Sequence, residues 1–148
     1  MSEAARTDAA ELVVAGQGLH TGAVGRVRFV RRPGPLQIRC ADRVLALSEL
    51  SVAPGARSTT VASRDGHVRI GTVEHLFAAL GALGVREGVE ISVEGPEIPL
   101  ADGCARTFFD ALSSLGVTPS PPRRRVTRAM TVRVGESVYE LSPGSGVC

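Results

Sequence analysis

The chain has 148 residues, of which 43% are hydrophobic and only 3% aromatic, so its length fits one domain with an aliphatic core. A net charge of +2 gives no reason to expect a nucleic-acid partner, and no run approaches the roughly 18 apolar residues of a membrane span. The N-terminal residues lack the pattern of a secretory signal, and the three widely spaced cysteines indicate a reducing compartment, so we expect a cytoplasmic protein.

We expect residues 1–10 to form a disordered tail and residues 11–148 to form a single α+β domain. Alternating apolar positions and turn residues predict strands at residues 11–15, 24–31, 36–40, 44–47, 57–62, 67–70 and 89–93. Pro33-Gly34-Pro35 is expected to end the second of these strands. The Asp65-Gly66 pair predicts a hairpin turn between the strands at 57–62 and 67–70. A last hairpin is predicted to pair residues 126–134 with residues 138–141.

Two helices are predicted, one over residues 73–83 and one over residues 105–115, each followed by a glycine that stops it. Thr72 is expected to cap the first helix through its hydroxyl. Strands, helix, strand, helix and strands follow one another along the chain. This order predicts a two-layer α+β sandwich, with both helices on one face of a mostly antiparallel sheet.

The first helix carries Glu74 and His75 side by side in its first turn. Bulky apolar residues recur on one side of this helix, at Val73, Leu76, Phe77, Leu80 and Leu83. Small residues occupy the other side, at Ala78, Ala79, Gly81 and Ala82. We expect such a helix to be covered on both sides, which places Glu74 and His75 at the rim of a second contact surface or a cleft.

A metal ligand and a general base are useful at such a rim, but the Glu74-His75 pair has a simpler explanation. The helix dipole alone favours a glutamate at a helix start by about 0.3–1 kcal/mol. The pair also does not complete a metal site, because catalytic zinc takes about three protein ligands. The spacing alone therefore leaves both interpretations open.

Three segments then follow one another in order, GLHTG at residues 18–22, VRIGTVEHLFAAL at 68–80 and EIPLADGCA at 97–105. Together they resemble the N-terminal domain of the UDP-3-O-acyl-N-acetylglucosamine deacetylase family, the zinc amidases of lipid A biosynthesis. The similarity runs from about Glu11 to Gly146, which is nearly the whole chain.

The resemblance implies that two similar α+β domains pack helix layer against helix layer, with the active site between them. It implies that His75 binds zinc and that Glu74 is the general base on the zinc-bound water. The substrate implied is a UDP-linked acylated glucosamine, from whose acetamide acetate leaves. The small-residue side of the first helix would then be the place where the other domain packs.

The resemblance carries further residues with it. It makes Asp102 an acidic residue that supports catalysis, and it places His20 in the substrate pocket together with Ser58 and Thr59. The residues themselves allow alternatives, namely a turn histidine at position 20 and a cap of the second helix at position 102. His67 is interpreted as a hairpin residue. The arginines at 123–125 are interpreted as a solvated strand entrance, with a phosphate or partner contact as the alternative.

The family's second domain is not found in this sequence. That domain should bring a His-x-x-x-Asp pair as the other zinc ligands, together with substrate-binding residues and a further histidine that acts as general acid. We therefore expect a zinc site that is incomplete in this chain, no activity from the chain alone, and a second deacetylase domain or chain on the helix layer. A fragment, half of a split enzyme, a homodimer sharing a metal, and a non-catalytic interaction or regulatory module remain open.

Overall fold

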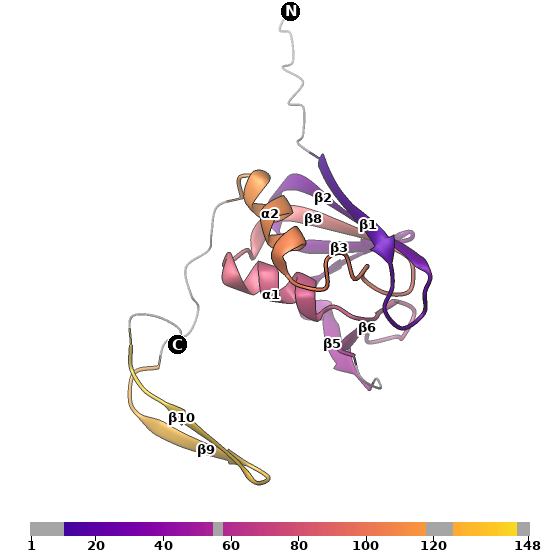
Figure 1. The fold of residues 1–148 in the computed structure, drawn as a ribbon. Helices are drawn as coiled ribbons and strands as arrows, with labels where there is room; N and C mark the ends of the chain where they lie inside the picture. Colours follow the sequence, from indigo (N-terminus) through magenta and orange to yellow (C-terminus); the bar gives the residue numbers. More distant parts are fainter. Residues whose placement is uncertain (1–10, 55–57, 118–125, 145–148) are drawn as a thin grey trace, which may run out of the picture.

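The computed structural model describes residues 11–54, 58–117 and 126–144. The predicted tail at 1–10, Arg57 and the arginines at 123–125 lie outside the described residues. The main sheet has five strands in the order β1-β2-β8-β3-β4 (Figure 1), and only the β3–β8 pair is parallel. Their bounds are β1 Glu11–Gln17, β2 Val24–Pro35, β3 Gln37–Cys40, β4 Arg43–Ala46 and β8 Glu87–Glu94.

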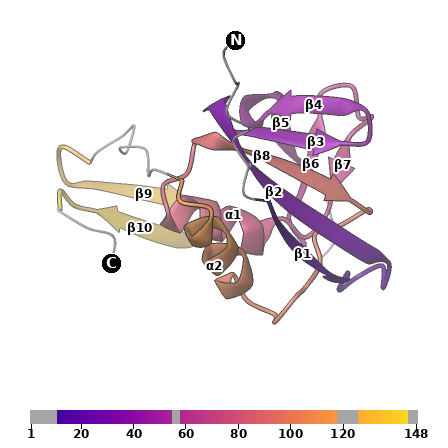
Figure 2. The ribbon, with the colours of Figure 1, turned by 90° about the horizontal axis from the view of Figure 1, so that it is seen from above.

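Two helices, α1 (Glu74–Ala82) and α2 (Arg106–Ser114), cover one face of this sheet (Figures 1 and 2). The predicted α+β class with two helices on one face is thereby confirmed. Alternation within β2 buries Val27 and Phe29 completely, opposite Val93 and Ile91 of β8. The same cluster takes in Ile38 from β3, Leu76 and Leu80 from α1, and Phe108 and Leu112 from α2. The aliphatic core expected from the composition therefore lies between the sheet and the helices.

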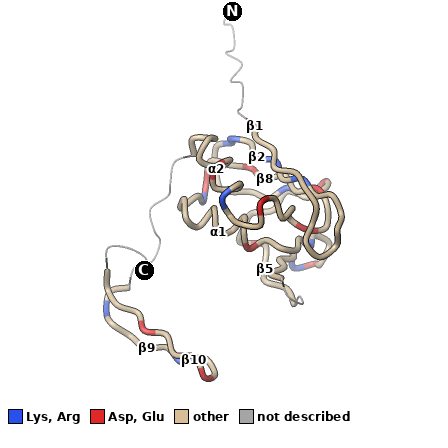
Figure 3. Tube along the Cα trace, in the orientation of Figure 1, with Lys and Arg blue, Asp and Glu red and all other residues tan. Residues whose placement is uncertain are grey.

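The opposite face of the sheet carries charged side chains, which alternate along β2 and β8 with the buried residues of the core. Figure 3 marks the acidic and basic residues along the chain. Glu90 lies on this opposite face, on β8, and accepts hydrogen bonds from Arg39 and Arg32. The bond from Arg39 contributes most to a pKa of Glu90 below its ordinary value. Arg26 pairs with Glu94 on the same face at 3.5 Å. Apolar and charged residues alternate along these strands, and the sheet therefore has one apolar and one polar face.

A second sheet joins β5 (Leu50–Ala53), β6 (Thr60–Ser63) and β7 (Arg69–Ile70), after a short 3-10 turn at Leu47–Glu49. The predicted hairpin is confirmed as the antiparallel β6–β7 pair. Gly66 adopts a φ of 73° in its turn, and its amide donates to the Ser63 carbonyl at 2.9 Å. A glycine tolerates this left-handed backbone without steric cost.

The largest differences from the sequence prediction concern β2 and β5. β2 does not end at Pro33 but continues to Pro35, because a bulge between Arg31 and Pro35 restores its pairing with β8. The sequence prediction did not include β5. Its four residues pair only with β6, and buried and exposed positions do not alternate along it. As predicted, a glycine follows the C-cap residue of each helix, Gly84 with a φ of 62° after α1 and Gly116 with a φ of 67° after α2.

A separate two-stranded hairpin follows, formed by β9 (Met130–Val134) and β10 (Ser137–Leu141). It confirms the last predicted hairpin, although β9 begins later than residue 126. Every residue of the two strands is exposed except Leu141, which is half-buried. Among the described residues, the core and the side chains packed on it extend no further than Val117. Neither helix of the described part of the chain has the length and hydropathy needed to cross a bilayer.

Candidate functional site

Glu74 is the first residue of α1, and Thr72 lies just before it in an unusual backbone conformation. The prediction that Thr72 caps the helix is wrong. The N-cap position is Val73, and no side chain bonds to the free amides there. Thr72 has a φ of 55° and donates its hydroxyl to Oε2 of Glu97 at 2.7 Å. Thr72 precedes the N-cap residue by one position, and its hydroxyl donates a charge-assisted hydrogen bond to Glu97 instead of accepting one from a helix amide.

Glu74 and His75 are both half-buried, so neither side chain is enclosed in the core. Oε2 of Glu74 accepts the backbone amide of Thr59 at 3.2 Å, and the carbonyl of Thr59 accepts the amide of Val73 at 3.1 Å. The segment before β6 is therefore fastened to the first turn of α1. This contact brings Thr59, and with it the half-buried Ser58, next to Glu74.

The small-residue side of α1 is largely uncovered by the described residues. Ala78, Gly81 and Ala82 are exposed, whereas Leu76 and Leu80 on the apolar side are buried. Ala79 differs from the prediction, because it is 1% exposed and belongs to the core. The helix surface beside His75 is therefore exposed in the described part of the chain.

Glu97 is the polar side chain that sequence reasoning missed. It is 3% exposed, yet its carboxylate joins two distant segments. Oε1 accepts the backbone amide of Thr21 at 2.7 Å and the Thr21 hydroxyl at 2.6 Å. The same oxygen accepts the backbone amide of His20 at 3.1 Å, while Oε2 accepts Thr72. One buried carboxylate thus links the 18–22 turn to the residue that precedes Val73.

Glu97 remains ionised in this position. Burial raises its pKa, but the hydrogen bonds it accepts, first those from Thr21, outweigh burial and lower the pKa of Glu97 to about 2. The sequence offered little to reveal this role, because the partners lie 76 and 25 residues away. The available signal was a glutamate inside the third motif, directly before the apolar Ile98.

Asp102 lies on the exposed loop before α2, where its carboxylate contacts Cys104 in the loop and the side chain of Thr107 in the first turn of α2. Its Oδ1 accepts the Cys104 amide at 3.2 Å, and the Cys104 thiol, which also donates to this carboxylate, helps to lower the pKa of Asp102. Asp102 does not cap α2, whose N-cap is Ala105 without a side-chain bond, because its carboxylate closes this earlier turn. His67 lies in the β6–β7 turn, with its amide bonded to Asp65 at 3.2 Å.

His75 could supply one metal ligand, since it is half-buried on a helix beside the exposed residues Ala78 and Ala82. A complete metal site needs more donors. Within residues 11–54, 58–117 and 126–144, no three His, Cys, Asp or Glu side chains come close enough together to hold a metal ion. The described residues therefore supply one candidate ligand and an adjacent carboxylate.

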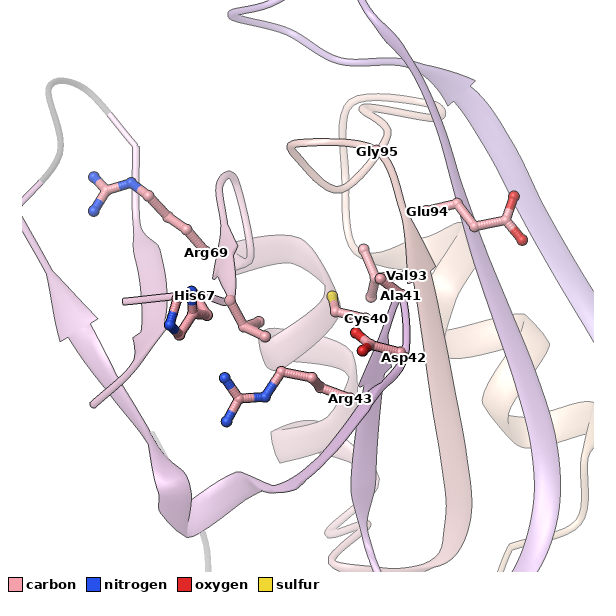
Figure 4. Close-up of a pocket in the computed structure, with 10 residues that line it drawn as sticks. Cys40, Ala41, Asp42, Arg43, His67, Arg69, Val93, Glu94 and Gly95 are labelled. Atoms are coloured by element: carbon pink, nitrogen blue, oxygen red, sulfur yellow. The ribbon is translucent and has the colours of Figure 1, made fainter. Parts of the chain in front are cut away.

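A pocket of about 820 Å³ lies elsewhere, between the β3–β4 turn, β7 and the end of β8 (Figure 4). Arg43 and Arg69 contribute to its wall, and neither Glu74 nor His75 lines it. Both arginines already have partners, because Arg43 pairs with Asp65 at 2.6 Å and Arg69 donates to a backbone carbonyl at 2.6 Å. This pocket is distinct from the first turn of α1.

Comparison with known proteins shows the family to which the chain is similar. A family model described as UDP-3-O-acyl N-acetylglycosamine deacetylase matches residues 5–148. Curated relatives with the name UDP-3-O-acyl-N-acetylglucosamine deacetylase include those of Shewanella pealeana and Shewanella oneidensis, each 36% identical over 141 residues. A third, from Shewanella piezotolerans, is 35% identical. Each alignment covers 88% of this chain and 45% of the relative, so the chain spans about half the length of these relatives.

Proposed function

The chain belongs to the UDP-3-O-acyl N-acetylglycosamine deacetylase family, and from this premise we propose that it forms one wall of a zinc-dependent deacetylase site. The proposed reaction is hydrolysis of the acetamide of a UDP-linked acylated N-acetylglucosamine, in lipid A biosynthesis. One observation carries the proposal. Glu74 and His75 lie side by side at the rigid start of α1, half-buried and beside an uncovered helix surface.

In this proposal His75 is one zinc ligand and Glu74 is the general base. Zinc, when bound, supplies Lewis acidity toward the acetamide carbonyl and lowers the pKa of water to about 7. The carboxylate of Glu74 takes the proton from the attacking water, a contribution of about 10²- to 10⁴-fold for a well-placed base. The Thr59 amide, bonded to the same carboxylate at 3.2 Å, orients Glu74 for this task.

The remaining predicted residues keep supporting roles. His20, Ser58 and Thr59 are proposed to line the substrate pocket. Two of them, His20 and Thr59, are tied to the segment before α1, through Glu97 and through Val73 respectively. Asp102 is proposed to support catalysis from the loop before α2.

The other zinc ligands are proposed to come from a second deacetylase domain or chain that packs on the helix layer. Two observations support this step. The described residues supply a single histidine at the site, and the small-residue side of α1 is exposed. We propose that the chain alone is inactive and that the assembled enzyme works in the cytoplasm. The free thiols of Cys40 and Cys104 fit that compartment.

Substitutions at the helix start test this proposal in the chain co-expressed with a deacetylase second half that carries a His-x-x-x-Asp pair. We expect Glu74→Gln to lower the deacetylation rate by at least about 10²-fold while the zinc content stays near one per complex, because only the base is lost. His75→Ala should lose both the zinc and the activity. The measurements are acetate release and metal analysis of the purified complex.

The matched control is His67→Ala, which removes an exposed histidine from the β6–β7 turn and should leave rate and zinc content unchanged. A Glu74→Gln complex that deacetylates at the unsubstituted rate would contradict the assignment of the base. A complex that binds no zinc and releases no acetate would instead favour a non-catalytic interaction or regulatory module.

A further inference from the structure

Thr72, beside the proposed site, is constrained both by its burial and by its backbone conformation. It is 2% exposed, and its φ of 55° lies in the left-handed region. A β-branched side chain rarely adopts that backbone, and it persists only where the surroundings hold it. Thr72 lies two positions before Glu74, so its backbone sets the direction in which α1 begins.

The segment around Glu97 holds Thr72 from one side. The Gly71 amide donates to the Pro96 carbonyl at 3.1 Å, and the Ile98 amide donates to the Gly71 carbonyl at 3.0 Å. These two bonds bracket Glu97, whose carboxylate then takes the Thr72 hydroxyl at 2.7 Å. Backbone and side chain of one short segment therefore fix two successive residues ahead of the helix.

The same carboxylate is enclosed by the 18–22 turn on its other side. It accepts the amides of His20 and Thr21 as well as the Thr21 hydroxyl. The turn approaches so closely that a Cβ added at Gly18 would lie 2.0 Å from Oε1 of Glu97. Glu97 cannot move aside for such a group without breaking these bonds. The turn that carries His20 and the start of α1 therefore share one anchor.

We propose that Glu97 is a positioning residue, which holds Thr72 in its left-handed conformation and thereby sets where Glu74 and His75 project relative to His20. The catalytic meaning of this inference rests on the proposed function. The geometry that it asserts belongs to this chain alone and is measurable without zinc or a second half.

Amide hydrogen exchange in the full 148-residue chain tests the geometry. The probe is the Val73 amide, which bonds to the Thr59 carbonyl at 3.1 Å, and the reference is the set of amides in the main sheet. In Glu97→Ala we expect the Val73 amide to exchange about tenfold faster relative to the sheet amides, because the Thr72 hydroxyl loses its hydrogen-bond partner. Glu97→Gln should restore most of the protection, since its amide oxygen still accepts and its amide nitrogen donates to the Thr72 hydroxyl.

Glu90→Ala is the matched control. Glu90 is also a buried carboxylate, with 9% exposure, but its partners are Arg32 and Arg39 on the far face of the sheet. Its loss should speed exchange in the sheet without a selective effect on Val73. An equal ratio of Val73 to sheet exchange in Glu97→Ala and the unsubstituted chain, or an equal change in Glu90→Ala, would overturn the inference.

If Glu97→Ala does not fold, a milder pair of variants tests the positioning role of Glu97. Thr72→Val keeps the branched shape and removes the donor, whereas Thr72→Ser keeps the donor. We expect faster Val73 exchange in the first and protection close to that of the unsubstituted chain in the second. Equal exchange in the two variants would overturn the inference.

The assembled deacetylase supplies a second readout. Glu97→Gln and Glu97→Ala should differ mainly in kcat, with KM changing less, because misplaced Glu74 and His75 affect the reacting centre more than substrate binding. Equal kcat values for the two variants would count against the positioning role. The two proposals can fail separately. Unchanged Val73 exchange with a catalytic Glu74 rejects only the inference about Glu97, and altered exchange in an inactive assembly rejects only the proposed function.

Discussion

The charge of Glu97 is held in the interior by uncharged groups. Its donors are the hydroxyls of Thr21 and Thr72 and two backbone amides, all within 3.1 Å. Burying a carboxylate without such partners is strongly unfavourable, whereas hydrogen bonds to a charged group contribute about 1.5–3 kcal/mol each. The side chain is therefore both a stabilising contact and a constraint on the segments it joins.

This arrangement predicts how the contribution of Glu97 depends on pH. The pKa of Glu97 is lowered from 4.5 to about 2, so the folded state favours the ionised form. The stability that Glu97 contributes is therefore fully present above a pH of about 4.5 and is lost as the pH falls toward 2. Urea unfolding at several pH values should show the unsubstituted chain losing its advantage over Glu97→Gln across this window. A difference that stays constant down to pH 2 would contradict the assigned cause.

At the scale of elements, α1 combines a buried apolar side with an exposed side of small residues. Gly81 lies on the exposed side, and a Cβ added there would meet nothing within 4 Å. Glycine within a helix costs backbone entropy without offering a compensating contact. In this chain, therefore, Gly81 weakens the helix that carries Glu74 and His75.

We expect Gly81→Ala to raise the free energy of unfolding by about 0.5–1 kcal/mol, measured by urea denaturation. Gly22→Ala is the control, because its added Cβ also meets nothing within 4 Å but its φ is 66°. The left-handed backbone should make that variant less stable by about 1–2 kcal/mol. Equal effects at the two positions would show that local space, and not backbone conformation, determines the outcome.

The helices and the β6–β7 hairpin were predictable from the sequence, because periodicity and turn chemistry are local signals. Leu76 and Leu80 mark the buried side of α1, and Asp65-Gly66 marks the hairpin turn. The bulge that carries β2 through Pro35 was not predictable, since it depends on pairing with β8, more than fifty positions later in the chain. Where the local sequence pattern was weak, pairing with a distant strand determined where β2 ends.

The same distinction applies to the candidate site. The adjacent Glu74 and His75 are visible in the sequence because they occupy one helical turn. The use of the Thr72 hydroxyl was mispredicted as a helix cap, since its acceptor, Glu97, is 25 residues away. Local rules favour a cap for a threonine at that place, and a buried carboxylate brought in by tertiary structure overrides them.

The proposed zinc site needs more metal donors than the described residues of this chain supply. The chain matches 45% of the length of its Shewanella pealeana relative, and its described residues contain no cluster of three metal-binding side chains. In the β9–β10 hairpin, all residues except Leu141 are exposed. A two-stranded hairpin is marginally stable without further packing.

Zinc titration of the chain, first alone and then with the second half, tests the central claim most directly. We expect no stoichiometric zinc on the 148-residue chain, one zinc per assembled complex, and loss of that zinc in His75→Ala. Deacetylation should appear only in the assembled, zinc-bound state. Stoichiometric zinc and acetate release from the chain alone, or full zinc binding by the His75→Ala complex, would contradict it.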